Sequence, residues 1–183
     1  MTVRDHGRAL FTDMSLDPVR RMGVGAYLVI PSVLLESAAL MINQAELQEQ
    51  PVQRRFECTS STTLEVETVI WALQDHCRRT TGHGPGKLQV YTDSQCISGL
   101  LKRRAELTAR DFVCRGTGLP LRNASLYGRF YELHDKLDFG VIKLKGHTNR
   151  GSRDAVHEIF SYLDRQVRKA LRLWMHEVRT QSY

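Results

Sequence analysis

The chain has 183 residues, of which 42% are hydrophobic and 25% charged, and its formal net charge is +6. These values are ordinary for one soluble globular domain with a core of its own. No apolar run approaches the length of a membrane span, which excludes a transmembrane segment.

The N-terminus, MTVRDHGRAL, has no apolar signal-peptide core, and the four cysteines form no CxxC pair. We therefore expect a cytoplasmic protein with reduced thiols and no zinc cage.

The charge is uneven: residues 1–91 hold nine Lys and Arg against ten Asp and Glu, and residues 92–183 hold 17 against ten. A basic second half suits a polyanionic partner such as nucleic acid.

The predicted elements alternate between strands and helices along residues 1–183, which we interpret as a single domain. Strands are expected at 9–15, 23–32, 53–61, from 88 and at 141–145, and helices at 62–80, after residue 93, at about 123–137 and at about 151–175. This βββ then αβαβα order predicts an α/β fold, a mixed sheet with helices packed on it. Residues 31–52 fit poorly and are interpreted as an insertion, a short helix or a mobile loop, between the second and third strands.

The stretch LQVYTDSQCISGLL, residues 88–101, leaves a strand and enters a helix through Asp93. The common interpretation of such a junction is a helix N-cap. However, Asp13 is expected at the end of the first strand in a similar setting, FTD against YTD. The carboxyl ends of neighbouring strands in an open sheet converge on one crevice. Asp13 and Asp93 are therefore candidates for one shared site.

Other acids and a histidine can reach the same crevice. Glu65 lies in the first turn of the helix expected from residue 62, and its rival Glu67 stands about 200° further round the helix. The segment KGHTNRGSRD brings His147 just past the last strand and Asp154 to the start of the last helix. Four acids without basic partners would repel one another. Mg²⁺ or Mn²⁺ would resolve that repulsion.

The fourth acid has three candidates on the last helix: Asp154, Glu158 and Asp164. Asp154 lies where the helix begins, Glu158 about 6 Å further along the axis and Asp164 about 15 Å further. Asp164 precedes Arg168 by four residues, a spacing typical of a surface ion pair. We select Asp154, for which the alternative is a residue that complements the helix N-terminus.

The motifs resemble those of ribonuclease H of the bacterial type 1 kind, a family of Mg²⁺-dependent nucleases that cut the RNA strand of RNA–DNA hybrids. The matching pieces are FTDMS, TTLEVETVIWAL, YTDSQ, PLRNASLYGRF and KGHTNRGSRD, which run in the family's order from about residue 8 to residue 173, omitting the insertion. The resemblance implies a ribonuclease H-like fold with a five-stranded mixed sheet in the order βββαβαβα. It also selects Glu65 over Glu67.

The resemblance further implies roles for individual residues. Asp13, Glu65, Asp93 and Asp154 would hold two Mg²⁺ ions per site, with Mn²⁺ as the alternative, for two-metal hydrolysis. His147 would assist proton movement or product release. The residues implied to bind the RNA–DNA hybrid are Ser60, Ser61, Thr62, Gln95 and Asn123. A basic run would follow the nucleic-acid backbone, with a solvated helix face as the alternative; it comprises Lys102, Arg103, Arg104, Arg110, Arg115 and Arg122.

The sequence departs from the family in three places: LDPVRRMG replaces a glycine-rich turn, His147 and Asp154 are unusually close, and the insertion has no counterpart. Two rival functions therefore stay open. One is a DNA-directed nuclease of the same fold, a resolvase or exonuclease, although Asp13-Met14-Ser15 lacks the Asp-x-Glu of proofreading exonucleases. The other is a catalytically silent nucleic-acid-binding module.

Overall fold

The computed structural model describes residues 7–36, 50–80, 87–144 and 154–181. Within these ranges the chain forms five strands and five helices in the order β1-β2-α1-β3-α2-β4-α3-α4-β5-α5. The strands are β1 (Arg8–Asp17), β2 (Met22–Pro31), β3 (Val52–Phe56), β4 (Leu88–Thr92) and β5 (Gly140–Lys143). The helices are α1 (Val33–Glu36), α2 (Ser61–Arg79), α3 (Gln95–Ala109), α4 (Ala124–Leu137) and α5 (Ala155–Thr180).

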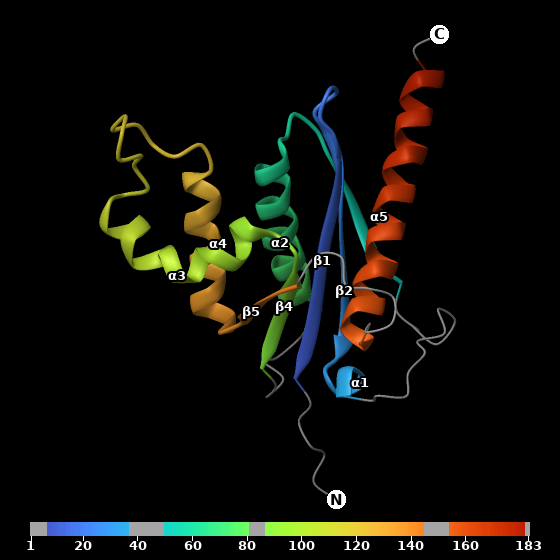
Figure 1. Ribbon diagram of the computed structural model, residues 1–183, viewed down its shortest axis with the longest axis horizontal. Coiled ribbons are helices and arrows are strands. Elements are labelled where there is room, and N and C mark those ends of the chain that lie inside the picture. The colour runs from blue at the N-terminus through green and yellow to red at the C-terminus, as the bar shows by residue number, and fades with distance from the viewer. Residues whose placement is uncertain (1–6, 37–49, 81–86, 145–153, 182–183) are drawn as a thin grey trace, which may run out of the picture.

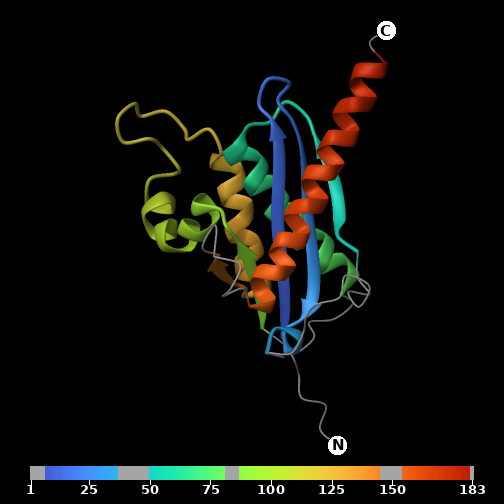
Figure 2. The same ribbon diagram turned by 45° about the vertical axis from the view of Figure 1, so that its right-hand side comes forward.

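The strands form one mixed sheet in the order β3-β2-β1-β4-β5. β1 and β2 pair antiparallel, as do β2 and β3, whereas β4 runs parallel to both β1 and β5. Helices α2, α3 and α4 lie on one side of the sheet and α5 runs across the other (Figures 1 and 2). The sheet is therefore the middle of three layers, and β1 is its central strand.

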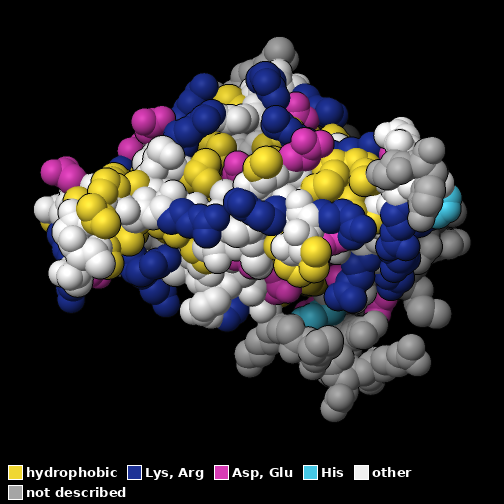
Figure 3. Space-filling model, turned by 90° about the horizontal axis from the view of Figure 1, so that it is seen from above, with side chains coloured by type: hydrophobic (Ala, Val, Ile, Leu, Met, Phe, Trp, Pro, Cys, Tyr) yellow, Lys and Arg dark blue, Asp and Glu magenta, His cyan; other side chains and the backbone are white. Residues whose placement is uncertain are grey.

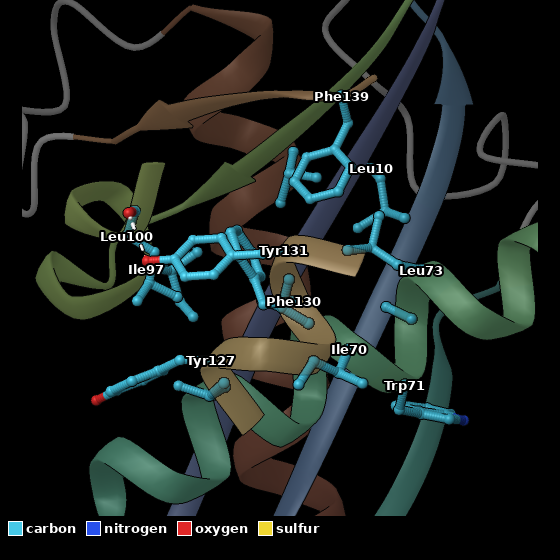
Figure 4. Packing of buried hydrophobic residues seen from close by; sticks show 14 of the residues in the cluster. Leu10, Ile70, Trp71, Leu73, Ile97, Leu100, Tyr127, Phe130, Tyr131 and Phe139 are labelled. Carbon is cyan, nitrogen blue, oxygen red and sulfur yellow. Dashed lines mark hydrogen bonds between the residues drawn. The ribbon is translucent and has the colours of Figure 1, made fainter. Parts of the chain in front are cut away.

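Alternation along β1 divides the core between the two faces. Leu10 packs with α2, α3 and α4, where Phe130 is also fully buried (Figure 4). Phe11 points to the opposite face and packs with Leu163 and Val167 of α5. Successive side chains of a strand point to opposite faces. Residues 9, 11 and 13 consequently share the α5 side of the sheet.

The predicted five-stranded mixed sheet with flanking helices is confirmed. Two helices, α3 and α4, separate β4 from β5, as the helices expected after residue 93 and at about 123–137 predict, although the order βββαβαβα counts only one. Residues 33–36 of the expected insertion form α1, and residues 37–49 lie outside the described ranges. The four cysteines are free thiols. Among the described residues, no helix is long and apolar enough to cross a bilayer.

The last helix continues to Thr180, five residues beyond its predicted end near Met175. Contacts with β3 account for the extension. The Arg55 guanidinium lies 5.1 Å from the ring centroid of Trp174 and forms an ion pair of 2.7 Å with Glu177. These contacts hold the last turns of α5 against the edge strand of the sheet.

Gly23 and Gly25 set how closely α2 approaches the sheet. A Cβ on Gly23 would overlap the side chain of Leu64, and one on Gly25 would overlap Thr68 and lie 2.9 Å from its Cγ2 atom. Leu64 and Thr68 are one turn apart on the buried face of α2. These two glycines therefore leave room for the helix.

We predict that Gly25→Ala lowers the free energy of unfolding by about 1–3 kcal/mol, because buried Thr68 must shift to admit the methyl group. Gly128→Ala is the matched control, since nothing lies within 4 Å of a Cβ at that position of α4. It should raise stability by about 0.5–1 kcal/mol, the usual gain when alanine replaces a helical glycine. Urea unfolding of both variants checks the difference. Equal effects would contradict this account of α2 packing.

Candidate active site

The parallel pairing of β1 with β4 brings two aspartates together. Phe11 pairs in register with Tyr91, and their rings stack with centroids 4.7 Å apart. Asp13 and Asp93 each follow two residues after this pair. Asp93 accordingly acts on the ionisation of Asp13. The FTD and YTD segments are therefore neighbours in space.

Asp93 is not the cap of the helix that follows it. Ser94 is the N-cap residue of α3, and its hydroxyl oxygen accepts a hydrogen bond of 3.2 Å from the backbone N–H of Ile97. The Asp93 side chain is exposed next to Asp13. The usual structural explanation for an aspartate at a strand–helix junction therefore does not apply here.

Glu65 approaches Asp13 and Asp93 from helix α2, on the side of the sheet opposite α5. It lies in the first turns of α2, and its carboxylate accepts a hydrogen bond of 2.7 Å from the Ser94 hydroxyl. Glu67, two residues on, accepts instead from Thr59 Oγ1 at 3.3 Å. Only Glu65 of the two lines the pocket between the strand ends.

The fourth carboxylate in this pocket comes from the middle of α5. Asp164 Oδ1 accepts a hydrogen bond of 2.6 Å from Arg168 Nε, and both residues line the pocket. The ion pair expected from their spacing is present, but it lies at the pocket rather than on a remote surface. Among the described residues, the lining consists of Thr12, Asp13, Met14, Glu65, Thr68, Thr92, Asp93, Ser94, Asp164 and Arg168.

This placement corrects the expected position of Asp154. Asp154 is the N-cap of α5: it accepts from the His157 backbone N–H at 3.0 Å and lies 2.7 Å from the His157 ring. Its side chain is 66% exposed and does not line the pocket. The exposed Glu158 does not line it either. His147 lies outside the described residues.

The geometry of β1 explains the difference. Asp13 shares the α5 face with Phe11, so a carboxylate that meets it must lie where α5 crosses the strand, not where α5 begins. Ten residues of helix separate these two points, about 15 Å at 1.5 Å per residue. The local pattern of a helix start could not reveal that crossing.

Burial dominates the electrostatics of Asp13. It raises the pKa of this carboxyl from 3.8 to about 8, and the charges of Asp93 and Asp164 act in the same direction. The hydrogen bond from the Met14 N–H, 2.8 Å from Oδ1, opposes the shift. The pKa of Glu65 is also raised, mainly by burial and further by the charge of Asp93, whereas the hydrogen bond from Ser94 opposes the shift. Burial therefore favours the protonated forms of Asp13 and Glu65.

Several buried oxygen atoms at the pocket have no hydrogen-bond partner among the described residues. They are Asp13 Oδ2, Thr12 Oγ1 and Thr68 Oγ1. An unpaired buried polar atom is costly. Carboxylate and hydroxyl oxygens are the donor atoms that Mg²⁺ and Mn²⁺ accept. The donor set at this pocket therefore fits a hard divalent cation.

The side chains are nevertheless not arranged around a cation. In the described part of the chain, no group of three or more His, Cys, Asp or Glu side chains is close enough to hold a metal ion. Three of the four pocket carboxylates accept from protein donors instead: Asp13 from Met14, Glu65 from Ser94 and Asp164 from Arg168. Metal binding would require these side chains to exchange partners.

The residues implied to bind substrate fall into two groups. Ser60 and Asn123 meet through Thr63, whose hydroxyl oxygen lies 2.8 Å from Ser60 Oγ and donates to Asn123 Oδ1 at 3.1 Å. The sequence analysis missed Thr63, although it follows Ser60 by one helical turn. Ser61 and Thr62 are exposed in the first turn of α2. These hydroxyls surround the junction of α2 and α4.

The second group lies on α3 and beyond it. Gln95 begins α3, is exposed, and accepts a hydrogen bond from the Lys143 ammonium. In the basic run, Arg104 donates to Asp135 at 2.5 and 2.7 Å. Arg110 and Arg115 pair with Glu106. These three arginines therefore have acidic partners, whereas Lys102 is exposed on α3 and Arg103 donates to the carbonyls of Gly99 and Cys96 in the same helix.

The raised pKa of Asp13 predicts how stability depends on pH. Because the folded protein holds a proton that the unfolded chain releases, this group lowers stability progressively between about pH 4 and pH 8. Asp13→Asn should therefore raise the Tm at pH 8 by at least about 3 °C, where 1 kcal/mol corresponds to about 2–4 °C. The gain should shrink at pH 5. Thermal unfolding without metal at both pH values checks this.

Asp17→Asn is the control of opposite sign. Hydrogen bonds from the Arg20 backbone and side chain lower the pKa of Asp17, so its ionised form stabilises the fold above pH 4. This variant should have a lower Tm than the wild type at pH 8 and converge with it in acid. An Asp13→Asn protein that melts below the wild type at both pH 5 and pH 8 would contradict the burial argument.

No protein-family model matches the chain, and no curated protein sequence matches it. Solved structures do. The RNase H domain of PFV matches with a TM-score of 0.65 at 16% identity, over 90% of this chain and 94% of that one. The native protease-reverse transcriptase of prototype foamy virus matches at 0.64 and 17%, over 90% of this chain and 20% of that one. A foamy viral protease-reverse transcriptase in complex with dsDNA matches at 0.59 and 12%, over 87% and 94%. The chain therefore has a ribonuclease H-like fold, as its sequence predicted.

Proposed function

We propose that this chain is a divalent-metal-dependent endonuclease that hydrolyses the RNA strand of RNA–DNA hybrids. The observation that carries the proposal is the convergence of Asp13, Glu65, Asp93 and Asp164 on one pocket, where β4 ends beside the middle of β1. These acids come from three layers of the fold. The likeness to an RNase H domain supports a nuclease with this arrangement.

Mg²⁺ or Mn²⁺ bound at this pocket would supply an activated water and stabilise the leaving oxygen of a phosphodiester. Asp13 has the central position, since it lines the pocket from the central strand and its Oδ2 has no hydrogen-bond partner among the described residues. Glu65 would hold the ion from the α2 side, Asp164 from the α5 side and Asp93 from the end of β4. His147, outside the described residues, keeps its proposed part in proton movement or product release.

The surface around the pocket suits a nucleic-acid partner. Ser60 and Asn123 offer neutral polar groups at the junction of α2 and α4. Lys and Arg side chains also spread over the end of the molecule that carries the β1–β2 turn (Figure 3). One structural neighbour was solved in complex with dsDNA, which supports duplex binding here. Hydroxyls such as those of Ser61 and Thr62 can recognise RNA through its 2′-OH groups.

The two rival functions differ from this one in measurable ways. A DNA-directed nuclease of the same fold would use the same acids on another duplex. A silent binding module would bind nucleic acid without using them. The unpaired Asp13 Oδ2 favours an enzyme, because a purely structural residue at this place would not need a buried carboxylate.

A parallel substrate assay tests the proposal. Labelled RNA–DNA hybrid, duplex RNA, duplex DNA and a four-way junction are each incubated with and without Mg²⁺. We expect cleavage of the RNA strand of the hybrid alone, and no cleavage without metal. Asp13→Asn should abolish cleavage and leave hybrid binding intact or improved, since repulsion from the phosphates falls. Substantial Mg²⁺-dependent activity in that variant would sink the assignment, and cleavage of DNA alone would favour the first rival.

A second comparison separates the two candidates for the fourth acid. Asp164→Asn should reduce kcat by about 100-fold or more, as expected when a group that stabilises the transition state is removed. Asp154→Asn should mainly lower the Tm through loss of the α5 cap, by about 1 kcal/mol. Steady-state kinetics and melting curves of both variants distinguish these effects. The reverse ranking would return the metal site to the start of α5.

A further inference from the structure

Arg168 is the one basic residue among those that line the acidic pocket. It follows Val167, a fully buried residue of α5, just as Asp164 follows buried Leu163. The two residues are therefore one turn apart at the edge of the buried face (Figure 2 shows α5 crossing the sheet). From that edge both side chains reach the pocket.

The ion pair between Asp164 and Arg168 is too exposed to contribute much to the free energy of folding. The side chain of Arg168 is 63% exposed and that of Asp164 is 34% exposed. Such surface pairs contribute little to folding, since solvent screens them and two long side chains must be ordered. The arginine does act on the pocket, because its charge also opposes the raised pKa of Asp13.

Arg168 already occupies one of the two carboxylate oxygens of Asp164. Its Nε donates to Asp164 Oδ1 at 2.6 Å, so this oxygen has a cationic partner. A divalent cation bound to this carboxylate would compete with the guanidinium for its negative charge and repel the guanidinium. Once displaced, the guanidinium stays at the rim of the pocket on a flexible, exposed side chain. A planar guanidinium is well suited to bind a phosphate.

We propose that Arg168 exchanges partners during the reaction cycle, an inference that rests on the proposed function. In the metal-free protein it neutralises Asp164. When a divalent cation binds Asp164, Arg168 is released and binds a phosphate of the nucleic acid beside the pocket. Arg168 is thus both a competitor of the metal and a substrate-binding residue.

The first test measures Mn²⁺ affinity without nucleic acid, by calorimetric titration. Arg168→Ala should bind Mn²⁺ about fivefold more tightly than the wild type, which corresponds to about 1 kcal/mol for the lost competition. Arg168→Lys keeps the positive charge but lacks the planar guanidinium, so its Mn²⁺ affinity should lie between those of the wild type and Arg168→Ala. Arg165→Ala is the matched control: it removes one exposed charge from the same helix, from a residue that does not line the pocket. Its Mn²⁺ affinity should equal that of the wild type.

The second test measures hybrid binding in EDTA and in Ca²⁺, with gels to verify that the hybrid stays intact. Arg168→Ala should weaken binding about threefold in Ca²⁺ but not in EDTA. In Ca²⁺ the slope of log affinity against log salt should fall by about one phosphate contact. Arg165→Ala should change neither.

Other outcomes overturn the proposal. Weaker Mn²⁺ binding by Arg168→Ala would make Arg168 a positioning residue for Asp164, and unchanged binding would make the pair an ordinary surface contact. Loss of hybrid affinity in EDTA as well would show that Arg168 binds phosphate without an exchange. If the wild type cleaved no nucleic acid, the proposed function would fail, whereas the Mn²⁺ titration would still decide whether Arg168 competes for Asp164.

Discussion

One carboxylate oxygen of Asp13 is buried without a hydrogen-bond donor among the described residues, which costs free energy of folding. The packing of the surrounding elements nevertheless holds it there. The residue cannot simply turn away. It shares a face of β1 with Ala9 and Phe11, which are buried against α5. A shift of one residue in register would move the whole apolar set to the wrong face. The pairing that secures the core therefore also fixes the carboxylate in its unfavourable position.

The remaining acids are brought to Asp13 by packing of different kinds. Asp93 arrives through parallel strand pairing, Glu65 through the close approach of α2 over Gly23 and Gly25, and Asp164 through the crossing of α5. None of these contacts is local in sequence. Burial of these carboxyls, together with the charges of neighbouring acids, opposes folding, as the raised pKa values of Asp13 and Glu65 show. The apolar clusters on both faces of the sheet provide the free energy that offsets this cost.

What could be predicted from the sequence is what local chemistry determines. The junction after β4 was interpretable because Ser94 could cap α3 and so leave Asp93 free of that role. Helical rotation allowed only one of Glu65 and Glu67 to face the crevice, and the resemblance to ribonuclease H selected Glu65. The role of Gly25 was not predictable, because it depends on Thr68 of a helix more than forty residues away. The additional turns of α5 likewise depend on Arg55 in a distant strand.

Asp164 is the clearest example of a residue whose place in the fold could not be predicted from its neighbours in the sequence. An acid four residues before an arginine looks the same in sequence whether it faces bulk solvent or a pocket. The difference lies in the neighbouring buried stripe, since Asp164 adjoins Leu163 at the level where α5 crosses β1. At this level the ion pair between Asp164 and Arg168 lies at the pocket. Glu65 accepts from a buried serine hydroxyl, which is costly to leave unpaired. Arg168 is exposed to solvent, so breaking its ion pair with Asp164 costs little free energy. Of the donors that hold the pocket's carboxylates, the guanidinium is thus the easiest to replace by a cation, and the α5 side of the pocket is the side from which the site can open.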